Sequence, residues 1–272
     1  MSSIGKTVVI ADDHETLVMY LSILLHRMGF EVIPAKNGEE VMEILETVTP
    51  DVVITDRRMP IMDGLTTLKV IKNDTRFSHI PVIVMSAYYD EKIRSECINA
   101  GAEGFLPKPV KVNALNALLQ ECVTYENNIK RTNMRCSYGR NVIVEHESKS
   151  IEYHAVTLSE GGIYLRTQKP LPVGENVTIH LETDTGSAVV TQGTVIYQKA
   201  IYNEVFKIDP GMAVQFNSLS AQDSDKLNRL IMNILAGDLQ DEQQEPVLDD
   251  VKTSINLNSR QAAILKSIMP TS

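Results

Sequence analysis

The feature that most constrains the fold is a regular alternation of short apolar runs with segments of helical periodicity over the first half of the chain. The runs are rich in β-branched residues and are TVVIA (7–11), EVIPA (31–35), DVVIT (51–55), PVIVM (81–85) and GFLP (104–107). Because they do not alternate apolar with polar residues, they indicate parallel strands that are covered on both faces. Five strand-helix units predict a doubly wound α/β domain over residues 1–125.

The pattern changes after this domain. Residues 126–135 are polar without a strand signal, so they are interpreted as a linker. Beyond them, short apolar runs separated by Gly, Pro and Asp predict a small antiparallel β-barrel over 136–237. Ser220 precedes an amphipathic segment that predicts a helix closing the barrel. The remainder, 238–272, begins with an acidic stretch and is expected to be a disordered tail.

Composition argues against several classes of protein. A chain of 272 residues is long for a single core, which favours two domains. The 35 acidic and 26 basic residues give a net charge of -9, which argues against a dedicated DNA or RNA binder. Three scattered cysteines fit a reducing compartment better than a disulfide or zinc framework. Since neither a signal peptide nor a run of about 20 apolar residues is present, we expect a cytoplasmic protein without membrane insertion.

Acidic residues directly follow two of the predicted strands. Asp12 and Asp13 come after the first strand, and Asp56 comes after the third. The carboxyl ends of parallel strands meet at one edge of a sheet, so these carboxylates are expected to converge in one crevice. Carboxylates this close repel one another and call for a cation, and Mg²⁺ suits oxygen ligands that also receive a phosphate. Taken singly, each acid fits equally well as a helix N-cap or a loop residue.

Two further polar residues follow the later strands. Ser86 comes after the fourth strand and Lys108 after the fifth. Their hydroxyl and ammonium groups would reach the same crevice and contact phosphoryl oxygens. With Asp56 as a carboxylate nucleophile, the set predicts an aspartyl-phosphate site.

Four segments resemble the signature segments of two-component receiver domains: IADDHE, ITDRRMPIMDG, IVMSA and GFLPKP. The resemblance covers residues 5–125. It implies that Asp56 accepts a phosphoryl group from a histidine kinase or a phosphotransfer protein. It also implies that Asp13, Asp56 and the backbone carbonyl of Arg58 bind Mg²⁺, with Asp12 acting through a water.

The same resemblance implies roles for residues around the last two strands. Ser86 and Lys108 would contact the phosphoryl group, and the Lys108-Pro109 bond is usually cis in such domains. Phe105 stands in the place of the switch aromatic, which turns inward as Ser86 moves toward the phosphate. An ordinary core phenylalanine is the alternative. Arg57, beside the acceptor, departs from the commonest pattern and is a candidate for tuning dephosphorylation.

Two arginines precede the predicted barrel, and a serine-glycine turn lies inside it. Arg131 and Arg135 form an RxxxR motif, while Ser159 and Gly162 belong to TLSEGG. Arginines bind phosphates bidentately and stack on purines, and a glycine turn lets a ligand approach the backbone. Together they predict a nucleotide clamp. Alone, RxxxR also fits a solvated linker.

This combination resembles the PilZ domain, a small barrel whose members commonly bind cyclic di-GMP. RxxxR, the turn, PLPVGENVTIHL, GTVIY, PGMAVQF and a closing helix follow in order over residues 129–237. The resemblance implies nucleotide contacts by Arg131, Arg135, Thr157, Ser159 and Gly162. Thr157 stands where the family has Asp or Asn, and a lost base contact costs about 1 to 3 kcal/mol, so we expect weakened rather than abolished binding. Arg140 and Arg166 are further basic candidates, or else barrel-surface residues.

The sequence therefore predicts a response regulator in which phosphorylation and cyclic di-GMP together regulate a downstream protein. The alternative is a receiver joined to a degenerate barrel that docks a protein without binding nucleotide. No GGDEF, EAL or HD-GYP motif is present, so no enzymatic output is expected. The acidic, β-rich second half also argues against a DNA-binding output. A receiver homodimer is compatible with the sequence.

Overall fold

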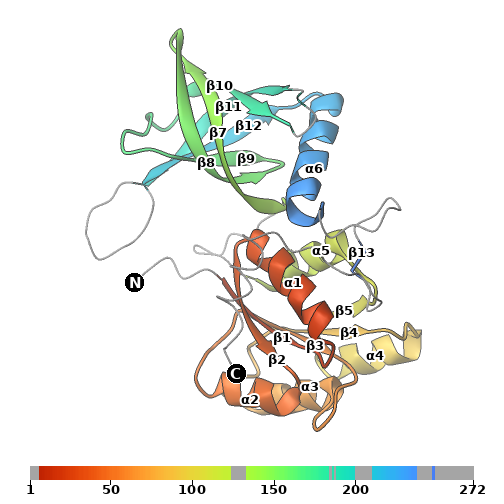
Figure 1. Cartoon of the computed structure of the whole chain (residues 1–272). Coiled ribbons are helices and arrows are strands. Elements are labelled where there is room, and N and C mark those ends of the chain that lie inside the picture. The colour runs from red at the N-terminus through yellow and green to blue at the C-terminus, as the bar shows by residue number, and fades with distance from the viewer. Residues whose placement is uncertain are drawn as a thin grey trace. The chain divides into compact units, whose positions relative to one another are not determined.

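The computed structural model describes residues 6–123, 133–183, 186, 188–199, 210–237 and 247–248. These residues fall into two compact units, one built on a parallel sheet and one on a β-barrel (Figure 1). The predicted fold class is confirmed for both units. The predicted linker lies outside the described residues except for its last three positions.

The first unit is a five-stranded parallel sheet with the order β2-β1-β3-β4-β5. Its strands are β1 (Lys6–Ala11), β2 (Phe30–Ala35), β3 (Val52–Asp56), β4 (Val82–Ser86) and β5 (Gly104–Pro107). Its helices are α1 (Glu15–Arg27), α2 (Gly38–Leu45), α3 (Gly64–Asn73), α4 (Glu91–Asn99) and α5 (Val112–Cys122). Figure 1 shows α1 and α5 on one face of the sheet and α2 and α3 on the other.

The strand order places the switch point of the sheet beside β1. Strands β1, β3 and β4 are buried along almost their whole length, as expected for strands covered on both faces. The chain leaves β1 to form β2 on one side and β3 on the other. This reversal leaves a crevice at the carboxyl ends of β1 and β3. Asp12 follows β1 directly, and Asp56 is the last residue of β3.

The second unit is a closed antiparallel barrel with the order β10-β11-β12-β9-β8-β7. Its strands are β7 (Arg135–His146), β8 (Lys149–Ser159), β9 (Gly162–Arg166), β10 (Asn176–Glu182), β11 (Ala188–Lys199) and β12 (Gly211–Ser218). Strand β7 begins at Arg135, so this arginine belongs to the barrel rather than to a linker. The predicted antiparallel β-barrel is confirmed, although β7, β8 and β11 are long strands.

Helix α6 (Ala221–Ala236) closes the barrel and packs on β7 and β11. Its N-terminus is capped by Ser220, whose Oγ accepts the N–H of Asp223 at 3.1 Å. One apolar stripe of the helix is buried, and it contains Leu227, Leu230, Ile231 and Leu235. This stripe matches the face expected from the sequence.

A short antiparallel pair completes the described structure. Strand β6 (Val110–Lys111) follows β5 and pairs with β13 (Val247–Leu248). Those two residues are the described part of the predicted tail, and the rest of 238–272 lies outside the description. Among the helices that the structure describes, none is long and apolar enough to cross a membrane.

Candidate functional site

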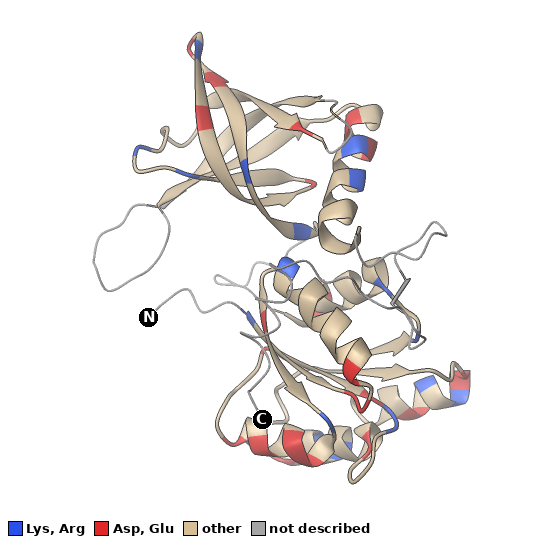
Figure 2. Cartoon of the chain, in the orientation of Figure 1, with Lys and Arg blue, Asp and Glu red and all other residues tan. Residues whose placement is uncertain are grey.

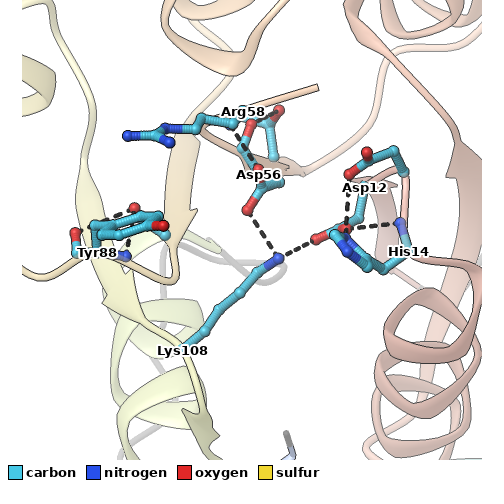
Figure 3. A network of polar contacts seen from close by, with 9 residues as sticks. Asp12, His14, Asp56, Arg58, Tyr88 and Lys108 are labelled. Carbon is cyan, nitrogen blue, oxygen red and sulfur yellow. Dashed lines mark hydrogen bonds and ion pairs between the residues drawn. The ribbon is translucent and has the colours of Figure 1, made fainter. Parts of the chain in front are cut away.

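One ammonium group bridges the acids in the crevice of the parallel sheet (Figure 3). The Nζ of Lys108 lies 2.7 Å from Oδ2 of Asp12 and 2.8 Å from Oδ1 of Asp56. Both acids are buried, with exposed fractions of 1% and 6%. Burial alone would lower the pKa of Lys108, but its hydrogen bonds to the two carboxylates outweigh burial and raise the pKa. Lys108 is therefore held as a cation between two buried anions.

Asp56 has both carboxylate oxygens fixed by hydrogen bonds. Its Oδ1 faces Lys108, and its Oδ2 accepts the backbone N–H of Arg58 at 2.6 Å. Burial is the largest cause that raises the pKa of Asp56, and the charge of Asp12 adds to it. Lys108 and the Arg58 amide act in the opposite direction without cancelling the rise. The carboxylate is thus well oriented, and further positive charge would favour its ionised form.

Asp13 and His14 extend the acidic cluster toward solvent. The Nδ1 of His14 lies 3.2 Å from Oδ1 of Asp12 and 3.2 Å from Oδ1 of Asp13. The backbone N–H of His14 also donates to Oδ1 of Asp12 at 3.0 Å. The possible ligand atoms of the three residues lie within 4.8 Å of one another. Sequence analysis did not identify His14, although its place directly after Asp13 was an available signal.

The charge balance of this crevice suits a divalent cation. The Lys108 ammonium pairs with the carboxyl groups of Asp12 and Asp56, and the Asp13 carboxyl lies close to that of Asp12, so the carboxyl groups of this cluster outnumber its ammonium group. Carboxylate oxygens are hard ligands of the kind that Mg²⁺ prefers. Three of the four predicted metal ligands therefore fit the ion through their side chains. The fourth, the carbonyl of Arg58, belongs to the residue whose amide is bonded to Asp56.

Ser86 lies at the carboxyl end of β4 but its hydroxyl is turned to the following loop. Its Oγ donates to the carbonyl oxygen of Tyr88 and accepts the N–H of Tyr88, each at 3.1 Å. The guanidinium of Arg58 lies 4.5 Å from the centroid of the Tyr88 ring (Figure 3). Tyr88 thereby joins Ser86 to the residue that orients Asp56. Sequence analysis missed Tyr88, whose signal was an aromatic residue two positions after Ser86.

Phe105 in β5 is half-buried and spans the core and the surface. It packs against the hydrophobic core of the sheet, and its ring centroid lies 6.2 Å from that of Tyr89, which is 62% exposed. The position suits both a core residue and an aromatic group that changes its burial. The peptide bond between Lys108 and Pro109 is cis, as expected.

Arg57 is directed away from the acids. Its Nη2 lies 3.1 Å from Oε2 of Glu96 on α4, and its charge acts on the buried thiol of Cys97. Burial raises the pKa of Cys97, and Arg57 lowers it in part. Arg57 therefore connects the strand that carries Asp56 to α4.

In the barrel, the predicted clamp residues lie on neighbouring strands. Arg135 on β7 is opposite Ser159 on β8, and Ser137 is opposite Thr157. Residues opposite one another in an antiparallel pair share a face. The intervening Cys136 is fully buried, so the two pairs lie on the outer face of the barrel. Arg131, the other arginine of the motif, lies outside the described residues.

The turn between β8 and β9 is closely packed within the barrel itself. The Oγ of Ser159 donates to the carbonyl oxygen of Gly162 at 3.1 Å. A Cβ on Gly162 would lie 2.4 Å from the carbonyl oxygen of Val214, and one on Gly161 would lie 2.3 Å from Nδ2 of Asn133. Both glycines are thus required by close approach. The contact with Asn133 also places this residue, which lies two positions before Arg135, beside the turn.

The two other basic candidates lie on the barrel surface. Arg140 is exposed, and its guanidinium lies 5.6 Å from the centroid of the Tyr138 ring. Arg166 is exposed at the end of β9, opposite His154 on β8. Arg166 ends β9, the strand that begins with Gly162 of the predicted clamp.

Comparison with known proteins gives the same division of the chain. Residues 8–120 match the family model of the response regulator receiver domain, and residues 129–233 match that of the PilZ domain. The DNA-binding transcriptional regulator NtrC of Escherichia coli (strain K12) is 36% identical over 116 residues, which are 43% of this chain and 24% of NtrC. This chain thus spans about a quarter of that relative's length.

A shorter relative is matched over most of its length. The polar-differentiation response regulator DivK of Brucella anthropi is 30% identical over 107 residues, which are 39% of this chain and 87% of DivK. Among solved structures, the chemotaxis response regulator CheY4 of Vibrio cholerae is 26% identical, with 44% of this chain and 99% of that chain covered and a TM-score of 0.42. The two family matches and the DivK relationship show that this chain belongs to the response regulators and carries a receiver domain followed by a PilZ domain.

Proposed function

We propose that this response regulator is phosphorylated on Asp56 by a histidine kinase or a phosphotransfer protein, and that its barrel binds cyclic di-GMP to regulate a downstream protein in the cytoplasm. The observation that carries the first part is the position of Lys108 between Asp12 and Asp56. It supplies a cation where a phosphoryl group would arrive. The protein acts through binding and conformational change, without an enzymatic output of its own.

The chemistry at Asp56 is a phosphoryl transfer. A carboxylate oxygen of Asp56 attacks the phosphorus of a phosphohistidine, the P–N bond breaks, and the histidine nitrogen leaves with the electron pair. Lys108 neutralises the arriving phosphoryl oxygens, and the Arg58 amide keeps the acceptor carboxylate oriented. When bound by the acidic cluster, Mg²⁺ supplies charge neutralisation to the same oxygens.

The hydroxyl of Ser86 connects this chemistry to a conformational change. To donate to a phosphoryl oxygen on Asp56, it must give up the hydrogen bond that it donates to the carbonyl of Tyr88. Release of Tyr88 frees the loop that also carries Tyr89, the neighbour of Phe105. The loop and Phe105 together form the element that changes state on phosphorylation.

Small phosphodonors test this site directly. The full chain, incubated with acetyl phosphate and Mg²⁺, is expected to gain one phosphoryl group in intact-mass spectrometry. The Asp56→Asn variant is expected to gain none. Asp51→Asn is the matched control, because Asp51 directly precedes β3, at the end of the strand opposite to Asp56, and pairs with Lys6. Phosphorylation of the Asp56→Asn variant to the same extent would refute the assignment.

Nucleotide binding by the barrel is supported by the Arg135–Ser159 pair on its outer face. A guanidinium beside a hydroxyl and a glycine backbone suits a phosphate diester. Calorimetric titration of the full chain with cyclic di-GMP is expected to show binding that Arg135→Ala weakens. Lys149→Ala, at the far end of β8, is the control. Absence of heat at micromolar protein concentrations would refute nucleotide binding.

A protein-docking barrel without nucleotide is the second candidate, and one observation favours it. Both glycines of the turn and the Ser159 hydroxyl already have partners or close contacts within the barrel. Their presence is therefore explained without a ligand. In this case neither the wild type nor Arg135→Ala gives binding heat in the titration with cyclic di-GMP. The nucleotide also leaves the melting temperature of both proteins unchanged.

If both ligands bind, their effects on each other are reciprocal. If beryllofluoride changes the affinity of the chain for cyclic di-GMP by some factor, cyclic di-GMP must change the affinity for beryllofluoride by the same factor. We expect the dissociation constant of cyclic di-GMP to differ with and without beryllofluoride and Mg²⁺. Identical constants would show that the receiver and the barrel act independently.

A further inference from the structure

Three neighbouring rows of residues cross the outer face of the barrel from β7 through β8 and β9 to β12. In each row, successive residues are opposite one another in the strand pairing. The first row is Arg135, Ser159, Gly162 and Gln215; the second is Ser137, Thr157, Tyr164 and Ala213; the third is Asn141, His154, Arg166 and Gly211. Three of the predicted clamp residues, Arg135, Ser159 and Gly162, lie in the first row, and Thr157 lies in the second. The other residues of the three rows, among them Tyr164 and Arg166, are not assigned to the proposed nucleotide contacts.

These rows suit an anionic ligand. They contain Arg135 and Arg166 but no aspartate or glutamate, although the whole chain has a net charge of -9. Glu160 lies beside them only in the turn that joins β8 to β9. Figure 2 shows acidic residues of β7 and β8 nearer the tip of their hairpin. These three rows, called the strip below, therefore form a surface without acidic residues on a chain that is acidic as a whole.

Tyr164 occupies the centre of the strip. It is half-buried and lies opposite Thr157 on β8 and Ala213 on β12. A Cβ on Gly211 would meet Cζ and the hydroxyl oxygen of Tyr164 at 3.0 Å each. The ring therefore extends along the sheet over the backbone of β12 rather than standing away from it. The closest atom to such a Cβ is the carbonyl oxygen of Leu165, so the glycine at 211 is required by the backbone of β9 as well as by the Tyr164 ring.

The partner of Tyr164 is the residue at which this barrel differs from its family. Thr157 has a short side chain that makes no hydrogen bond with any residue of the described structure. Its hydroxyl can donate or accept one bond to a base edge but cannot match a carboxylate or an amide. An aromatic ring binds a base through its face and needs no hydrogen bond.

We propose that Tyr164 stacks on a purine base of the bound nucleotide and offsets the edge contact that Thr157 lacks. This inference rests on the proposed binding of cyclic di-GMP by the barrel. Stacking depends on ring area, whereas edge contacts identify the base. The site should therefore select purines over pyrimidines and discriminate guanine from adenine only weakly. Arg166 lies two residues further along β9 and contributes positive charge at the other border of the strip.

The test is calorimetric titration of full-length variants with cyclic di-GMP. Loss of one base-aromatic stack in Tyr164→Leu is expected to raise the dissociation constant by roughly fivefold to a hundredfold. Tyr164→Phe keeps the ring and is expected to bind as the wild type does. Tyr197→Leu is the matched control, because Tyr197 is 49% exposed and continues the same row beyond Ala213. Melting curves without nucleotide show whether each variant is folded.

The outcomes separate this inference from the proposed function. If the wild type binds cyclic di-GMP and Tyr164→Leu binds equally well, stacking is refuted and the nucleotide function stands. If the wild type does not bind cyclic di-GMP, both the stacking inference and the proposed nucleotide function are refuted. Should Tyr164→Leu fail to fold, competition on the wild type decides: comparable affinities for cyclic di-GMP and cyclic di-UMP would refute purine stacking. Thr157→Asp is expected to raise the preference for cyclic di-GMP over cyclic di-AMP.

Discussion

The hydroxyl of Ser86 is hydrogen-bonded to both backbone groups of Tyr88, donating to its carbonyl and accepting from its N–H at 3.1 Å each. The same hydroxyl is the group that the receiver resemblance brings to the phosphoryl group. It cannot do both at once, since the single proton of the hydroxyl is given to Tyr88. If Ser86 contacts the phosphoryl group as proposed, the Ser86–Tyr88 bonds belong to the unphosphorylated state of the loop.

Removal of this hydroxyl should uncouple the loop from the acceptor. In Ser86→Ala, both bonds to Tyr88 are lost in every state, so beryllofluoride should no longer change amide exchange over residues 87–90. The wild type and Ser86→Thr should show such a change, because both have a hydroxyl that can move. Hydrogen-deuterium exchange measures this. An unchanged beryllofluoride response in Ser86→Ala would exclude Ser86 as the connecting group.

Lys108→Ala should affect Mg²⁺ binding and phosphorylation in opposite directions. Mg²⁺ competes with the Lys108 ammonium for Asp12 and Asp56, so removal of the ammonium should tighten Mg²⁺ binding by roughly tenfold. Phosphorylation by acetyl phosphate should become slower by at least about tenfold, because the phosphoryl oxygens lose a cation. Calorimetry and intact-mass spectrometry measure the two effects. Lys92→Ala, an exposed position on α4, should change neither; weaker Mg²⁺ binding in Lys108→Ala would contradict the competition.

The raised pKa of Asp56 predicts a pH-dependent stability. Because burial favours its protonated form in the folded chain, wild-type stability falls as pH rises from 3.8 through the raised folded value. Asp56→Asn has no such titration, so its stability relative to the wild type should increase over this window and then level off. Melting temperatures in chelator between about pH 4 and pH 8 measure the difference.

Asp74→Asn provides the control for this titration. Hydrogen bonds from Arg76 lower the pKa of Asp74, so its contribution to stability is complete about one pH unit above the unfolded value of 3.8, and the variant should show a constant difference from about pH 5 upward. A relative stability of Asp56→Asn that falls with rising pH would mean that Lys108 outweighs burial at the acceptor.

Gly162→Ala should destabilise the barrel without any nucleotide present. The added Cβ would lie 2.4 Å from the carbonyl oxygen of Val214, so β9 and β12 must separate. Overpacking of this kind costs about 1 to 3 kcal/mol. Chemical denaturation of the nucleotide-free chain measures the loss, with Ser137→Ala, exposed on the outer face of β7, as the control. Unchanged stability would leave ligand contact as the reason for this glycine.

The architecture was predictable from the sequence because its signals are local. Apolar runs without alternation predict doubly covered strands, and the order of strand and helix segments predicts a parallel sheet. The convergence of Asp12 and Asp56 follows from the geometry of such a sheet, since both residues come at strand ends. The cis bond at Lys108-Pro109 followed from the family motif.

Only the tertiary structure decided which of these groups are partners. Lys108 is far from Asp12 in the sequence, and their contact depends on how β1, β3 and β5 are placed in one sheet. The rotation of the Ser86 hydroxyl toward Tyr88 likewise follows from the path of the loop after β4. In the barrel, residue spacing gave Arg135, Ser159 and Gly162, but strand register determined that Tyr164 faces Thr157. Sequence periodicity sets which residues can be buried, whereas long-range register and loop paths set which side chains meet.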